Sequence, residues 1–455
     1  MKRCRMPITV VAVVLAACQP NAPEGDSVLA DEGPRQYSAT LAARVVVPFE
    51  SRLRLPADVP VAMRLSGKFT HPEIPLLDVP GSYPAASFGS DPSAPRFTGV
   101  RFPIDGQPLQ GFSGISAGPD GTFVVTLDNG FGSKSNSRDA LLAFIRLRFR
   151  WETGDVDILE ESILHDPDRI LPFAIVNDST EKRYLTGGDL DPESVQVVGS
   201  SVFIGEEFGP FLLRANFDGR ITAFYEATMG DDTLRSKSDN PLPSPANVRR
   251  LHAGSKGFEG MALSSDERYL YLMLEGPIVD PVTNEPESVN DSSVLRILVF
   301  DVEQQRFTDN NYRYLPEQTG NLIGDFNFIN EHEALVIERG PGEGDARLAC
   351  GDEVTPDCFN NPARFKRVYR VSFEGLQSGD AVRKLGYIDL LDIQDGDERF
   401  TFPFVTIESV IRADETHLIV ANDNNYGFSV GRTFGRNDDN EIILVEAPGF
   451  LGATR

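Results

Sequence analysis

Acidic residues recur at corresponding places in several short apolar segments. Glutamates open three of these segments, in DPES, GFEGMA and TIES, as Glu193, Glu259 and Glu408. Other acids follow the next apolar run, namely Asp128, Glu206 or Glu207, Glu275, Glu338 and Asp423. Converging carboxylates repel one another unless a cation lies among them, and hard oxygen ligands of variable geometry suit calcium. We therefore predict a calcium site, and its expected ligands are Glu193, Glu259, Glu275, Glu408 and Asp423.

A structural role for the same acids stays open. Each carboxylate could instead accept backbone N–H bonds at a strand turn, as acids in repeats often do. Asparagines in the NDNN segment, Asn422, Asn424 and Asn425, would add neutral oxygen ligands to a metal. The pattern does not match the twelve-residue EF-hand loop, and no histidine pair has the spacing of a zinc site.

Cations near these acids could bind phosphate. Lys256 stands three residues before Glu259, Arg339 directly follows Glu338, and Arg432 lies shortly after the NDNN segment. An arginine can contact two phosphate oxygens at once, so we predict phosphate binding by Lys256, Arg339 and Arg432. The predicted catalytic set is Glu259, Glu408, Lys256 and Arg432, with a metal-activated water as nucleophile and a carboxylate as general base. The alternative is that these cations are solvated loop charges paired with acids.

One segment matches the sequence pattern of a serine-nucleophile motif but not the structure that the motif requires. Gly114-Ile115-Ser116-Ala117-Gly118 matches G-x-S-x-G, which requires a strand, a sharp turn and then a helix. Here Pro119-Asp120-Gly121 and a further apolar run follow, so a hairpin is expected. Only His417 would be available as the catalytic partner, and it lies within an expected strand.

Composition and charge restrict the partners. The 455 residues include 43 Lys plus Arg and 68 Asp plus Glu, giving a formal charge of −25. Such a surface repels phosphate backbones, so nucleic acid is not an expected partner. We expect a monomer that acts on a small-molecule ester.

The first 18 residues predict export and lipid anchoring. Three basic residues precede an apolar run too short to span a membrane, which ends in Leu15-Ala16-Ala17-Cys18. This resembles a bacterial lipobox, so residues 1–17 are predicted to be a signal peptide and Cys18 the lipidated residue. Gln19 after the cysteine favours the outer membrane. Residues 18–39 are expected to be a flexible tether, and contact with the membrane is expected through the lipid only.

Two of the cysteines remain for the body of the chain. Cys350 and Cys358 flank a polar loop, CGDEVTPDC. In an exported chain this spacing predicts a disulfide that closes a small loop. A two-cysteine metal site is the competing interpretation.

The elements that must position these residues are short strands. Apolar runs of five or six residues, such as FVVTL (123–127) and YLYLML (269–274), alternate with turn sequences rich in Gly, Pro and Asp. Long amphipathic helical stretches are scarce. An all-β fold is expected.

Internal repetition predicts the architecture. Five segments share one layout of motif, strand, turn, strand and acidic end: 111–132, 191–211, 257–277, 324–342 and 404–427. They recur at intervals of about 65 to 80 residues, the size of one four-stranded blade with generous loops. We predict a β-propeller over residues 40–450, with six blades (seven are possible by length). Strand 441–447 is expected to pair with residues from 40–100 and close the ring.

Together these motifs resemble the bacterial phytase-like domain family described by the esterase-like activity of phytase. The matching residues are Gly257 to Ala262, Asp191 to Ser194, Ile407 to Ser409 and Ala421 to Asn425, and the resemblance spans about residues 40–447. It implies a distant relationship to calcium-dependent propeller phytases, which cleave phosphate monoesters. The leading hypothesis is a calcium-using phosphate-ester hydrolase. The alternatives are a calcium-dependent carboxyl esterase or lactonase, and a surface binding propeller without catalysis.

Overall fold

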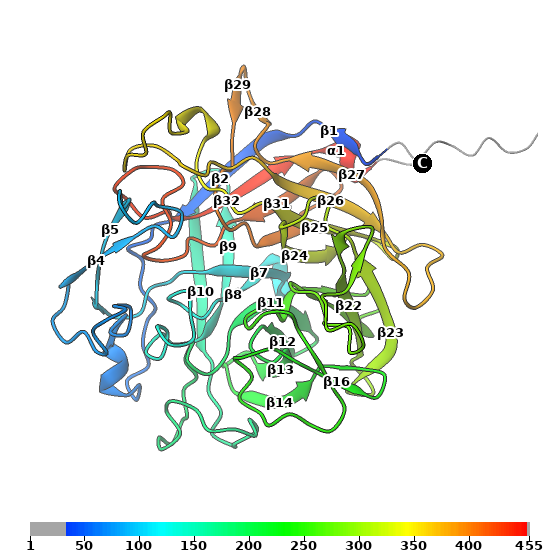
Figure 1. Cartoon of the computed structure of the whole chain (residues 1–455), viewed down its shortest axis with the longest axis horizontal. Coiled ribbons are helices and arrows are strands. Elements are labelled where there is room, and N and C mark those ends of the chain that lie inside the picture. The colour runs from blue at the N-terminus through cyan, green and yellow to red at the C-terminus, as the bar shows by residue number, and fades with distance from the viewer. Residues whose placement is uncertain (1–32, 453–455) are drawn as a thin grey trace, which may run out of the picture. The chain divides into compact units, whose positions relative to one another are not determined.

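The computed structural model describes residues 33–452 (Figure 1). The predicted signal peptide, the lipidation of Cys18 and most of the predicted tether lie outside the described residues. Within them, Pro34 onward forms one compact unit. No helix among residues 33–452 is long and apolar enough to cross a bilayer.

Five antiparallel sheets of at least four strands dominate this unit. Blade 1 consists of β7 (Phe112–Ala117), β8 (Phe123–Leu127), β9 (Ala143–Arg150) and β10 (Asp155–Ile163). Blade 2 consists of β11 (Pro192–Val198), β12 (Ser201–Glu206), β13 (Phe211–Asn216) and β14 (Ile221–Glu226). Blade 3 consists of β18 (Phe258–Leu263), β19 (Tyr269–Leu274), β22 (Leu295–Asp301) and β23 (Arg306–Tyr314).

The last two blades include strands from both ends of the chain. Blade 4 consists of β24 (Leu322–Phe328), β25 (Glu333–Arg339), β26 (Lys366–Ser372) and β27 (Arg383–Asp389), with β1 (Arg35–Tyr37) added in parallel. Blade 5 consists of β30 (Ser409–Arg412), β31 (His417–Ala421), β32 (Asn440–Glu446) and β2 (Thr40–Val47). The hairpin of β28 (Ile393–Asp395) and β29 (Glu398–Phe400) extends this sheet.

The first strands of the five sheets form a ring. Contacts run from β7 to β11, β18, β24, β30 and back to β7, so the fold is a β-propeller with these strands around its axis. Glycines permit the close approach: a Cβ at Gly260 would lie 3.0 Å from the backbone N of Phe326, and one at Gly324 2.3 Å from the carbonyl O of Ile407. Apolar side chains fill the space between neighbouring blades, as where Phe144 of blade 1 packs with Ile204 and Leu213 of blade 2.

The propeller has five blades, so the prediction of six is wrong. The five sequence repeats correspond to the five blades, one inner hairpin each. Six were expected from dividing residues 40–450 by the repeat size, but residues 48–110 form no four-stranded sheet. They form short pairs, β3 (Leu65–Ser66) with β6 (Ile104–Asp105), and β4 (Tyr83–Ala86) with β5 (Phe97–Phe102). We call residues 48–106 the N-terminal excursion.

Ring closure occurs as predicted. β2 pairs antiparallel with β32 over Thr40 to Val47, so the start of the domain supplies the outer strand of the blade made by its end. The segment predicted as a tether ends sooner than expected, because Arg35–Tyr37 forms β1 against β27. The predicted disulfide between Cys350 and Cys358 is present.

A polar network ties the inner strands together along the axis. The amide N of Asn327 donates to the carbonyl O atoms of Ile115 (3.1 Å) and Val410 (2.9 Å), in β7 and β30. Gln196 of β11 donates to Asn327 Oδ1 (2.7 Å) and to the carbonyl O of Met261 in β18 (2.6 Å). All five inner strands therefore take part in one buried network.

Candidate functional site

Eight carboxylates gather at one end of the channel, where the second strands of the blades end and the inner strands begin. We call them the acidic ring: Asp128, Asp191, Glu193, Glu207, Glu259, Glu275, Glu408 and Asp423. The four blades other than blade 4 all contribute to it. Side chains far apart in the sequence meet here because equivalent strand ends of a propeller converge on its axis.

Strand irregularities aim two of these glutamates. The pairing of β11 with β12 shifts register between Pro192 and Ser194, and that of β18 with β19 shifts between Phe258 and Gly260. A β-bulge leaves its extra residue unpaired and redirects the side chain. Glu193 and Glu259 are the residues at these shifts.

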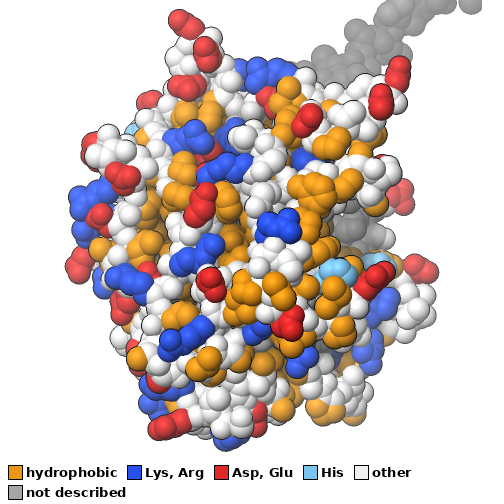
Figure 2. All heavy atoms as spheres, turned by 90° about the vertical axis from the view of Figure 1, so that its left-hand side faces the viewer, with side chains coloured by type: hydrophobic (Ala, Val, Ile, Leu, Met, Phe, Trp, Pro, Cys, Tyr) orange, Lys and Arg blue, Asp and Glu red, His pale blue; other side chains and the backbone are white. Residues whose placement is uncertain are grey.

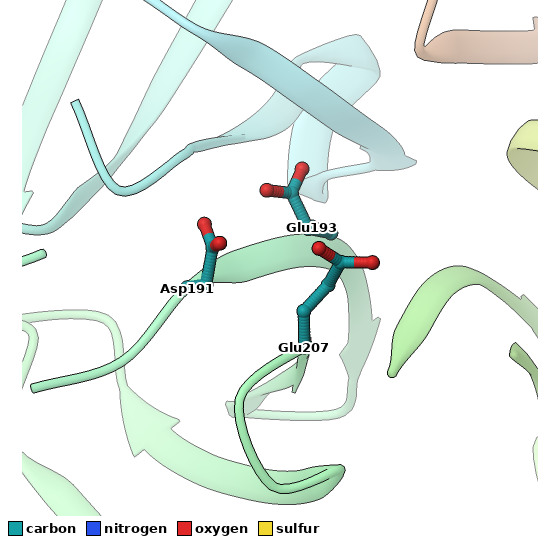
Figure 3. Close-up of side chains that lie close together, drawn as sticks. All are labelled: Asp191, Glu193 and Glu207. Carbon is teal, nitrogen blue, oxygen red and sulfur yellow. The ribbon is translucent and has the colours of Figure 1, made fainter. Parts of the chain in front are cut away.

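Two triads of carboxylates lie close enough to share a cation. Asp191, Glu193 and Glu207 each place an oxygen within 4.8 Å of the others, and so do Glu207, Glu259 and Glu275. Figure 3 shows the first triad, in which Glu193 of β11, Asp191 just before β11 and Glu207 just after β12 lie close together. Glu207 belongs to both triads, which makes it the carboxylate that links them.

Cations occupy one half of the ring. Arg339 Nη2 lies 2.6 Å from Glu408 Oε1, 3.7 Å from Glu259 Oε1 and 3.8 Å from Glu275 Oε1. Lys256 forms an ion pair with Glu275. On the other half, Asp191 accepts from neutral donors, Asn129 Nδ2 (2.8 Å) and Ser255 Oγ (3.0 Å). The first triad is thus the part of the ring that has fewer positive charges beside it.

Two buried carboxylate oxygens of the acidic ring have no hydrogen-bond donor among the described residues. They are Oε1 of Glu207 and Oε1 of Glu259, whose residues are 6% and 4% exposed. A buried polar atom without a partner is costly, so such atoms are uncommon in native structures. These oxygens point to a ligand that supplies positive charge.

Burial and mutual repulsion raise the pKa values around the ring. Burial first, and then the charges of Asp191 and Glu408, raise the pKa of Asp128 to about 8. Burial and neighbouring carboxylates also raise the pKa of Glu193, Glu207, Glu259 and Asp423 well above the ordinary range. A bound divalent cation would offset both effects.

These residues fit a hard divalent cation. The donors are carboxylate oxygens held by several separate elements, two of them unpartnered, and calcium accepts six to eight such oxygens in flexible geometry. The structural alternative also holds in part. Within the ring, Asp128 and Asp423 accept from the backbone N atoms of Gly130 (3.0 Å) and Asn425 (2.7 Å). Two acids outside the ring have donors of their own. Glu206 accepts from the backbone N atoms of Phe208 and Gly209, and Glu338 accepts from Tyr314 and Lys384.

Most of the predicted site residues meet at the ring. Glu193, Glu259, Glu275, Glu408 and Asp423 belong to it, and Lys256 and Arg339 contact it. Asp128, Asp191 and Glu207 were missing from the predicted ligand set. Asp191 lies two residues before Glu193 in the DPES motif, and this spacing was the signal that could have found it.

Arg432 does not join the others, contrary to the predicted phosphate-binding and catalytic set. Its guanidinium forms two hydrogen bonds to Glu441 and one to the carbonyl O of Thr401 (2.7 Å). It also lies over the ring of Phe404, 5.0 Å from the centroid. These contacts hold Arg432 in the loop that precedes β32.

The G-x-S-x-G segment is a hairpin, as expected. It spans the turn from β7 to β8, and Ser116 Oγ lies 3.2 Å from Gln196 Oε1. His417 Nδ1 lies 3.0 Å from the carboxylate of Asp414. Neither side chain contacts the other.

Comparison with known proteins identifies a family. A family model described as phytase-like, esterase-like activity of phytase, matches residues 107–426. No curated protein sequence matches the chain.

Solved propeller structures resemble the chain weakly. A luciferin-regenerating enzyme aligns at 10% identity and a TM-score of 0.33, covering 74% of this chain and 78% of its own. A gluconolactonase from Xanthomonas campestris aligns at 12% identity and a TM-score of 0.32, covering 81% and 97%. A putative 6-phosphogluconolactonase from Bacteroides uniformis aligns at 12% identity and a TM-score of 0.31, covering 78% and 93%. The propeller assignment rests on the sheets described above.

Proposed function

The chain belongs to the phytase-like family, and we propose that it hydrolyses phosphate esters with calcium held in the acidic ring. The observation that carries this proposal is the pair of carboxylate triads joined by Glu207, with buried unpartnered oxygens on Glu207 and Glu259. Family membership supports ester hydrolysis as the class of reaction. Phosphate as the type of ester and calcium as the cation are the parts that we propose beyond family membership.

Asp191, Glu193 and Glu207 would hold the first cation, because no Lys or Arg among the described residues forms an ion pair with them. Calcium bound there would activate a water molecule and polarise the ester oxygen. Glu259 Oε1, which accepts no hydrogen bond among the described residues, would be placed to accept a proton as a general base. Arg339 restrains Glu259, Glu275 and Glu408 around that point.

Two lysines could contact the phosphoryl oxygens. Lys256 stands beside Glu275 and acts electrostatically on Glu207, so its ammonium lies at the junction of the two triads. Lys134, on the loop after β8, donates to the carbonyl O of Asp239 (2.7 Å), and its charge acts on Asp191. The eight carboxylates outnumber these cations, so phosphate binding would require calcium first.

A carboxyl ester or lactone is the second candidate substrate. Lys256 and Arg339 are both paired with ring carboxylates, which leaves less positive charge for a phosphate dianion. A neutral ester avoids this repulsion, and the same calcium could polarise a carbonyl oxygen.

Activity on matched substrates tests the proposal. Inorganic phosphate release from phytate and from 1-naphthyl phosphate, and hydrolysis of 1-naphthyl acetate and a δ-lactone, would be measured with calcium and with EDTA. We expect calcium-dependent phosphate release that falls at least tenfold in Lys256→Met, with calcium affinity retained. Cleavage of the carboxyl ester or lactone alone would favour the second candidate. Turnover of none of them by folded protein would contradict both.

A further inference from the structure

An exposed aromatic ring stands on the same end of the propeller as the acidic ring. Phe88, in the N-terminal excursion between β4 and β5, is 58% exposed. Its ring stacks on Phe428, with centroids 4.6 Å apart and an angle of 11° between the planes. Stacking fixes one face of the Phe88 ring and leaves the other available to a ligand.

Three loops at the carboxylate end hold this segment. The backbone N of Phe88 donates to the carbonyl O of Phe428 (3.0 Å) in the loop after β31. Ser87 donates to Glu343 in the loop after β25, and that carboxylate is also bound by Arg96 Nη1 at 2.5 Å. The Phe88 ring covers Gly132 in the loop after β8, where a Cβ would lie 2.6 Å from Phe88 Cζ.

These contacts limit how far Phe88 can lie from the acidic ring. Gly132 follows Asp128 by four residues, Phe428 follows Asp423 by five, and Glu343 follows Arg339 by four. A chain of four residues spans at most about 14 Å even when fully extended. Loops of blades 1, 4 and 5 thus bring Phe88 within reach of a ligand that has one end in the acidic ring.

The excursion lies outside the part of the chain that the family model matches. The family match begins at residue 107, whereas Phe88 and both strands that flank it come before that residue. Figure 2 shows the face on which β4 and β5 lie, where hydrophobic side chains gather among Lys and Arg. A polyphosphate such as phytate has no apolar part that would use an exposed phenyl ring.

We propose that Phe88, backed by Phe428, binds the organic group of the substrate, so that the chain acts on anionic esters with an aryl or other planar apolar group. This inference rests on the proposed function for the position of the reacting group. Stacking of a planar group on Phe88 adds affinity of roughly two- to tenfold.

Calorimetric titration with two ligand pairs tests it on the calcium-loaded protein. The pairs are the non-hydrolysable 1-naphthylphosphonate with methylphosphonate, and 2-naphthoate with acetate. We expect the naphthalene ligand of a pair to bind roughly two- to tenfold more tightly than its small partner in the wild type, and about equally in Phe88→Ala. Phe97→Ala is the matched control, because Phe97 is also on the excursion and 49% exposed. Phe97→Ala should keep the wild-type difference in affinity between the two ligands of each pair.

The outcomes separate this inference from the proposed function. If only the carboxylate pair binds and shows the difference, Phe88 binds the organic group but phosphate is the wrong anion. The inference is overturned if the naphthalene ligands bind the wild type no more tightly than their small partners, or if Phe88→Ala keeps the difference in affinity. It is also overturned if no ligand of either pair binds. Melting temperatures of both variants would show that they are folded.

Discussion

At the scale of single residues, the acidic ring holds more carboxylates than cations, and the cations neutralise only some of its members. Arg339 and Lys256 form ion pairs with Glu259, Glu275 and Glu408, whereas no Lys or Arg of residues 33–452 forms an ion pair with Asp128, Asp191, Glu193 or Glu207. This asymmetry leads to two predictions about charge.

The first concerns the pH dependence of stability. The folded-state pKa of Asp128 is raised to about 8, above its value in an unfolded chain, because of burial and then of Asp191 and Glu408. The folded protein therefore binds more protons than the unfolded chain between about pH 4 and pH 8. Without calcium, the melting temperature should fall as pH rises from 6 to 8, and saturating calcium should remove most of this fall. Asp128→Asn should flatten the calcium-free profile. A calcium-free melting temperature that rises with pH would contradict the assignment.

The second concerns Arg339 as an internal counter-cation. Arg339→Met would leave three buried glutamates without their shared guanidinium, which should lower the calcium-free free energy of unfolding by about 3 kcal/mol or more. Calcium should then raise the melting temperature more in Arg339→Met than in the wild type, since it can compensate the freed carboxylates. Arg432→Met, which removes an arginine paired outside the ring, should show only the wild-type calcium response. Equal calcium responses in all three proteins would refute this role.

At the scale of elements, the inner strands carry both the site and the network that fixes their spacing. Asn327 links β24 to β7 and β30 through two backbone carbonyls. Asn327→Leu would leave those buried acceptors unpaired, at a cost of about 1–3 kcal/mol each. Chemical denaturation should show a loss of about 2 kcal/mol or more. Asn310→Leu, at an exposed position of β23, should change stability by less than about 0.5 kcal/mol. Similar losses in both variants would contradict the structural role of the network.

The sequence predicts the inner hairpins better than the blades. Repeats such as GFEGMALSSDERYLYLML show the inner strand and the strand beside it, because motif, turn and acidic end recur together. The outer strands have no comparable motif, so the blade number had to be taken from the length of residues 40–450. Because residues 48–106 form no blade, that length overestimates the number. Arg432 was misplaced for a similar reason. Its nearness to the NDNN segment in sequence does not reveal that Glu441, at the start of β32, binds it.

The sequence could not identify the ligand where backbone geometry decides which of two acids points to the acidic ring. Glu207 and Glu206 are adjacent acids at the end of β12, and the sequence does not distinguish them. In the structure Glu206 turns to the backbone N atoms of Phe208 and Gly209, which directs Glu207 to the ring. Glu193 and Glu259, by contrast, were predicted correctly from their repeated place, although the register shifts that aim them depend on pairing with the neighbouring strand.

At the scale of the whole molecule, closure of the ring depends on the start of the domain. β2 covers β32 over its full length, and Val45 of β2 is completely buried. A chain that begins at Pro34 should melt like the full chain. One that begins at Pro48 lacks β1 and β2, exposes the edge of β32 and should aggregate or lose its cooperative transition. An unchanged melting curve for the shorter chain would show that closure by β2 is dispensable.

The central claim is that the acidic ring is a calcium site centred on Glu207, and calorimetric titration with calcium tests it most directly. The wild type should bind calcium, and Glu207→Gln, which removes a ligand charge common to both triads, should lower the affinity at least tenfold. Glu267→Gln, an exposed glutamate in the turn between β18 and β19 at the opposite end of the channel, should bind calcium as the wild type does. Calcium binding that is absent from the folded wild type, or equal in Glu207→Gln, would contradict the account.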